Sequence, residues 1–120
     1  MKDDFVKQFQ SVTDALGSAA KGLMGKLDHF TFKMLIDNLK SNDTQVVLDT
    51  IETIENEKKP LSIPPLYFVM KNHPNQFIRN RAEKALYSMV PQADVERLTA
   101  GKPIEEAVKA MIMEYGNYKF

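Results

Sequence analysis

The sequence predicts an all-α protein in which two helical hairpins are stacked between capping helices. One observation is a pattern that recurs after thirty-one residues between Leu35 and Leu86, with apolar residues at helical spacing on both sides of a short polar break. Another is composition, because 120 residues with 43% apolar content are typical of one globular domain. We therefore expect a single all-helical domain over residues 1–120.

The thirty-one-residue shift aligns polar as well as apolar positions. Lys40, Gln45 and Glu52 recur unchanged at the shifted positions, and the matched apolar pairs are Leu35 with Leu66, Leu39 with Met70, Val46 with Phe77, Val47 with Ile78, Ile51 with Ala82 and Ile54 with Ala85. Residues thirty-one apart should therefore occupy equivalent places in two hairpins that lie side by side.

Residues 1–27 predict a capping helix followed by a glycine-containing linker. Phe5, Phe9 and Leu16 recur near helical spacing, whereas three glycines between residues 17 and 25 each disfavour a helix interior by about 1 kcal/mol relative to alanine. We expect the helix to cover the first repeat. Docking on a membrane surface or on a partner is the alternative.

Residues 28–59 form the predicted first repeat. Asp28 is a suitable cap for a helix that ends at the polar turn Ser41-Asn42-Asp43. A second helix should run from about residue 44 to residue 56 and stop before Pro60, since proline cannot continue a helix. Its expected buried residues are Val46, Val47, Ile51 and Ile54.

Residues 60–90 form the predicted second repeat. Ser62 could cap its first helix, with Pro64 and Pro65 tolerated in the first turn. After a break at His73-Pro74, a second helix should run from about residue 75 to residue 89. Its expected buried residues are Phe77, Ile78, Ala82, Ala85 and Leu86.

Residues 91–120 predict C-terminal capping helices and an aromatic tail. A short helix over residues 91–99 should be closed by Gly101, and a longer one should open at Pro103 and end at Gly116. These helices would cover the open end of the stack. The tail could pack on the last helix or dock on a partner or a neighbouring copy.

The second repeat resembles a known family. The segments Ser62-Ile-Pro-Pro-Leu66 and Phe77-Ile-Arg-Asn-Arg-Ala-Glu-Lys-Ala-Leu86 look like a HEAT-like repeat of the short phycobilin-lyase type, and the match covers about half of the chain. In the first repeat Leu48 stands where the family has arginine, and isoleucines replace its alanines. The resemblance implies a short right-handed α-solenoid. It also implies a structural pair between Asp43 of one repeat and Arg79 of the next, for which a ligand contact is the alternative.

In such solenoids the second helix of each repeat lines the concave face, so the resemblance implies a partner-binding strip there. The strip is polar and mixed in sign, which suits a protein surface better than a phosphate backbone. An ordinary solvated face is the alternative. Its residues are Gln45, Leu48, Asp49 and Glu52 in the first repeat and Gln76, Asn80, Glu83 and Lys84 in the second, with Leu48 as a large apolar exception.

The chain offers few groups for chemistry. It has no cysteine, and its two histidines, His29 and His73, lack ligand-type spacing to other metal-binding side chains. No nucleophile elbow or phosphate loop is present. We therefore expect no catalytic residue, no metal and no cofactor. No apolar run reaches the roughly twenty residues of a membrane span, and the lack of cysteine favours the cytoplasm.

These observations predict a non-catalytic scaffold or adaptor that binds a protein partner. The resemblance adds an alternative, an accessory factor of bilin attachment or phycobilisome turnover, although no lyase residue carries over. A second alternative is weak nucleic-acid binding, which the balance of sixteen basic and sixteen acidic residues disfavours. The identity of the partner and homo-oligomerisation stay open.

Overall fold

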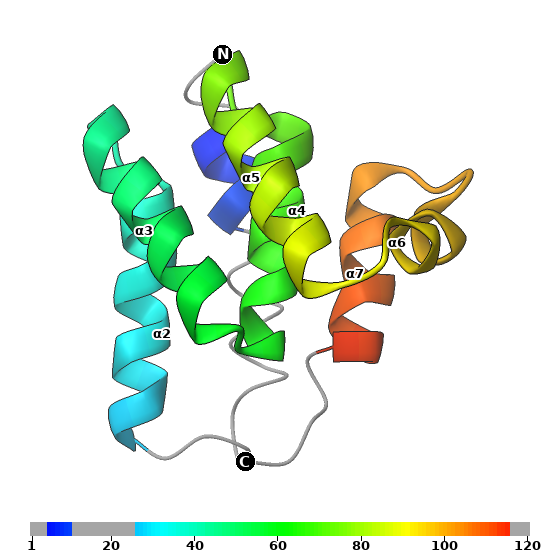
Figure 1. The fold of residues 1–120 in the computed structure, drawn as a ribbon, viewed down its shortest axis with the longest axis horizontal. Helices are drawn as coiled ribbons and strands as arrows, with labels where there is room; N and C mark the ends of the chain where they lie inside the picture. The colour runs from blue at the N-terminus through cyan, green and yellow to red at the C-terminus, as the bar shows by residue number, and fades with distance from the viewer. Residues whose placement is uncertain (1–4, 11–25, 116–120) are drawn as a thin grey trace.

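The computed structural model describes residues 5–10 and 26–115, and within these ranges the chain is helical and contains no strand (Figure 1). The all-α class is therefore confirmed. None of the described helices is long and apolar enough to cross a membrane. After the helical residues 5–10 come α2 (Lys26–Leu39), α3 (Thr44–Glu57), the 3-10 turn η1 (Pro60–Ser62), α4 (Ile63–Asn72), α5 (Gln76–Met89), α6 (Gln92–Thr99) and α7 (Ile104–Tyr115).

Helices α3 and α5 both begin with a side-chain N-cap. A side-chain oxygen of Asp43 accepts a hydrogen bond from the backbone N–H of Gln45 at 3.0 Å, and Asn75 Oδ1 accepts one from the N–H of Phe77 at 2.8 Å. Such caps satisfy backbone donors that have no partner within the helix. Helix α3 ends at Glu57, and the next residue, Lys58, caps it with a φ of 54°, in the left-handed region usual for a helix C-terminus.

Two expected caps differ from the structure. Helix α2 begins at Lys26, so Asp28 lies in its first turn and not at the N-cap position. Ser62 makes no side-chain capping bond and is buried in η1, because the tight turn already leads the chain into α4. Pro64 and Pro65 do occupy the first turn of α4, where a missing N–H has no cost.

Helix α4 lies at the centre of the fold. Every residue from Ile63 to Met70 is buried, because α5 and α7 pack on it from different sides. The rings of Phe5 and Phe9, from the first described helix, lie 5.6 Å and 4.9 Å from the ring of Phe68. A helix that is apolar on all sides is stable only inside a core.

Helices α3 and α5 lie side by side and run in the same direction, in front of α2 and α4 (Figure 1). Burial follows the thirty-one-residue correspondence. Val47 and Ile78 are at most 1% exposed, and the same holds for the pairs Ile51 with Ala82 and Ile54 with Ala85. The aligned apolar residues therefore form equivalent inner faces on the two helices.

One matched pair leaves the core. Phe77 is 66% exposed and Val46 is only half-buried, so the prediction that both are buried is wrong. Each precedes the first buried residue of its helix, Ile78 or Val47, and successive residues of an α-helix point about 100° apart. Phe77 is thus turned away from the face that packs on α4.

The C-terminal helices lie where the sequence predicts them. Val95 is the buried residue of α6, and Gly101 follows with a φ of 71°, which favours glycine. The buried side of α7 comprises Ala107, Val108, Met111 and Ile112. The predicted glycine-containing linker and the aromatic tail after Tyr115 fall outside the described residues.

Candidate functional site

The eight predicted partner-binding residues lie on the outer sides of α3 and α5. Seven are exposed, and the exception is Leu48, which is half-buried and packs against the core. The expectation that Leu48 faces outward is therefore corrected. Leu48 precedes Ile51 by three residues, which places it at the edge of the buried side of α3.

Phe77 belongs to this surface and was missed by the sequence reasoning. It precedes Lys84 by seven residues, so both project from one side of α5. We define the α3–α5 face as these nine residues: Gln45, Leu48, Asp49, Glu52, Gln76, Phe77, Asn80, Glu83 and Lys84. The thirty-one-residue shift did not indicate that Phe77 is exposed, because it matched Phe77 to another apolar residue, Val46.

An ion pair joins the two helices beneath this face. Arg81 Nη2 lies 2.9 Å from Glu55 Oε1, and the side chains are 26% and 22% exposed. Ser88 Oγ donates to the other carboxylate oxygen at 3.4 Å. The hydrogen bond from Arg81 is the main cause of a lowered pKa at Glu55, although burial of the carboxylate acts in the opposite direction.

The predicted pair between Asp43 and Arg79 is not among the ion pairs of the described residues. Asp43 caps α3, whereas Arg79 Nη1 donates to the backbone carbonyl of His73 at 2.6 Å. Arg79 reaches this carbonyl because it lies in the first turns of α5, directly after the turn that His73 begins. The ion pair that links α3 and α5 in the described residues is Glu55 with Arg81.

His73 supports the same turn. Its Nδ1 accepts a hydrogen bond from the backbone N–H of Asn75 at 3.0 Å, and its ring lies 4.9 Å from that of Phe5. No group of three or more His, Cys, Asp or Glu side chains in residues 5–10 and 33–115 could hold a metal ion. His73 thus has a role in shaping the α4–α5 connection.

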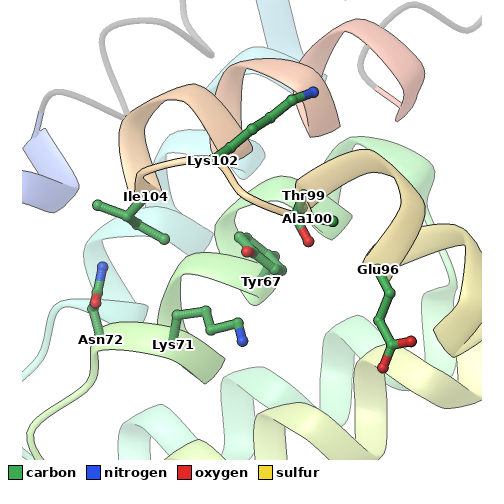
Figure 2. Close-up of a pocket in the computed structure, with 8 residues that line it drawn as sticks. All are labelled: Tyr67, Lys71, Asn72, Glu96, Thr99, Ala100, Lys102 and Ile104. Carbon is green, nitrogen blue, oxygen red and sulfur yellow. The ribbon is translucent and has the colours of Figure 1, made fainter.

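A groove runs beside α4 toward α6 and the start of α7. It consists of two cavities of about 430 Å³ and 260 Å³ that share Tyr67, Lys71, Glu96 and Thr99 (Figure 2). The smaller cavity also borders Glu83 and Tyr87 of α5. Sequence reasoning missed this groove because its walls come from separate helices with no shared periodicity.

Charge and aromatic surface meet in the smaller cavity. Burial raises the pKa of the Tyr87 hydroxyl, and the nearby carboxylates of Glu83 and Glu96 raise it further. Gln92 Nε2 donates to Glu96 Oε1 at 3.0 Å, and the ammonium of Lys71 lies 6.0 Å from the centroid of the Tyr67 ring. The groove therefore combines two acidic side chains with two phenol rings.

Comparisons with known proteins add no family assignment. No family model matches the chain, and neither the curated proteins nor the solved structures contain a significant match.

Proposed function

We propose that this chain is a non-catalytic scaffold or adaptor module that binds a partner protein through the α3–α5 face. The observation that carries the proposal is Phe77, a large aromatic side chain left 66% exposed among polar neighbours. Aromatic residues provide a disproportionate share of binding energy in protein interfaces. A ring of polar and charged side chains around such an anchor is the usual composition of an interface rim.

The charges of the face favour a protein partner over a nucleic acid. Asp49 and Glu52 lie on α3 and Lys84 lies on α5, all exposed. Arg81 is already paired with Glu55 and so adds little free positive charge. Nucleic-acid binding depends on several cations that contact successive phosphates, whereas a surface of mixed sign suits a complementary protein surface.

The proposal includes a short right-handed solenoid of two HEAT-like hairpins. Its support is the packing of α2 on α3 and of α4 on α5, together with a burial pattern that recurs after thirty-one residues in α3 and α5. In an array of this kind, equivalent helices of successive repeats produce one extended binding surface.

Comparative affinity capture tests the proposal. Tagged wild type, Phe77→Ser and Met113→Ser are incubated with a lysate of the native cells, after circular dichroism has established that all three are folded. Met113 is the matched control, because it is a large apolar side chain that is 78% exposed on a different helix, α7. We expect a protein captured by the wild type and by Met113→Ser to be lost with Phe77→Ser. Equal recovery by all three chains contradicts the proposed face.

A further inference from the structure

The smaller cavity of the groove is bordered by two phenol rings and by two carboxylates from different helices. Tyr67 is 3% exposed and Tyr87 is half-buried, so the phenol rings belong to the walls. Glu83 projects from α5 and Glu96 from α6, and both are exposed. We call this site the tyrosine groove and define it by Tyr67, Lys71, Glu83, Tyr87, Gln92 and Glu96.

The two carboxylates have no cation as a salt-bridge partner among the described residues. Both border the same cavity as Tyr87, and both add to the effect of burial in raising the pKa of its hydroxyl. The one ammonium that borders the cavity belongs to Lys71, and it lies over the ring of Tyr67 at the outer limit of a cation–π contact. The charged residues of the tyrosine groove are Lys71, Glu83 and Glu96, so its formal charge is −1.

We infer that the tyrosine groove receives an arginine side chain of the partner protein, with the guanidinium on the Tyr87 ring between Glu83 and Glu96. This inference rests on the proposed function and adds the chemistry of the partner residue. A planar guanidinium can stack on an aromatic ring and at the same time donate hydrogen bonds at its edges, which an ammonium cannot do. Because Glu83 also belongs to the α3–α5 face, one partner segment can contact both.

Lys71 provides the discriminating variant. Its ammonium competes with an incoming cation for the same negative potential, so removal of the charge should strengthen arginine binding. An anionic ligand would instead lose affinity when Lys71 is neutralised. The direction of the effect therefore distinguishes the two classes of ligand. Figure 2 shows the Lys71 side chain extended next to Tyr67. Glu96 lies on the other side of the groove.

The test is an NMR titration of the full chain with the capped peptide acetyl-Ala-Arg-Ala-amide, followed through the ring signals of Tyr87. The control peptide carries citrulline, which has nearly the shape of arginine without its charge. We expect saturable shifts with arginine and at least fivefold weaker binding with citrulline, since an exposed ion pair corresponds to about that factor. Binding should also weaken as salt is added.

Variants locate the site. Glu83→Gln and Glu96→Gln should each weaken binding of the arginine peptide about fivefold. Tyr87→Phe should retain binding because it keeps the ring, and Tyr87→Leu should lose it. Lys71→Met should strengthen binding about twofold or more. Glu106→Gln, an exposed carboxylate on α7, is the matched control and should change nothing. Equal shifts with the two peptides, absence of saturation, or weaker binding by Lys71→Met each overturn the inference. Those results leave the Phe77 capture experiment unaffected, so the two proposals fail separately.

Discussion

Glu55 of α3 and Arg81 of α5 form an ion pair at 2.9 Å, and it links the two helices whose outer sides carry the proposed interface. Both side chains are partly buried, which reduces screening by solvent. We expect Glu55→Gln and Arg81→Met to be non-additive in a double-mutant cycle by about 1 kcal/mol, measured by urea denaturation. The control cycle uses Glu57 and Lys59. Lys59 Nζ lies 3.6 Å from Glu57 Oε2, and both side chains are about half exposed. Equal coupling free energies in the two cycles would show that the location of the Glu55–Arg81 pair between α3 and α5 does not strengthen it.

The same carboxylate predicts a specific pH dependence. The pKa of Glu55 is lowered from 4.5, first by the hydrogen bond from Arg81, so folding favours the charged form. Its stabilising contribution is therefore complete above pH 4.5 and is lost as the pH falls through the lowered value. The difference in unfolding free energy between wild type and Glu55→Gln should be largest near neutral pH and shrink in acid. A difference that stays constant from pH 7 to pH 3 would contradict this assignment.

Adjacent residues of α5 should respond in opposite ways to truncation. Phe77 is 66% exposed and Ile78 is 1% exposed. Phe77→Ala should change the free energy of unfolding by no more than about 0.5 kcal/mol, whereas Ile78→Ala should cost about 3 kcal/mol by opening a cavity in the core. Thermal and urea denaturation measure both. A large loss for Phe77→Ala would mean that the ring is packed in solution.

The first described helix should contribute strongly to stability. Phe9 is fully buried, and its ring lies 4.9 Å from Phe68 of α4. Phe9→Ala should therefore cost about 3 to 5 kcal/mol. Val6→Ala is the control from the same helix, because Val6 is 37% exposed and its loss should cost about 0.5 kcal/mol or less. Similar losses for the two variants would argue that this helix is docked through another face.

The sequence was sufficient where a helix has one apolar side and one polar side. Val47, Ile51 and Ile54 are spaced for burial, and their equivalents in α5 follow from the repeat, so both inner faces could be read directly. Phe77 was misplaced because apolar character alone does not show where a buried face begins. The buried side of α5 is set by Ile78, Ala82, Ala85 and Leu86, and the rotation of 100° per residue turns Phe77 away from it.

Contacts between side chains of different helices could not be predicted from the sequence pattern. The predicted pair was Asp43 with Arg79, whereas Arg81 pairs with Glu55 and Arg79 bonds to the His73 carbonyl. Identifying the correct pair requires the axial position of α5 relative to α3, which no local pattern contains. The tyrosine groove needs the placement of α6 relative to α4, which is set by α7, because both α6 and α4 pack on that helix. Helix α4 does carry a signal for complete burial, since eight successive residues from Ile63 to Met70 include no charged side chain, whereas a pattern with one apolar face indicates burial on one side only.

The enclosure of α4 has a consequence for how the molecule assembles. Its covers come from opposite ends of the described chain, with residues 5–10 on Phe68 and α7 on another side. During synthesis on the ribosome, α5 can pack on this apolar segment before α7 does, so the side that α7 covers stays exposed until α7 has emerged. Deleting residues 5–10 or α7 would uncover apolar side chains of α4 and should lower the free energy of unfolding, although both segments lie outside the repeated pattern.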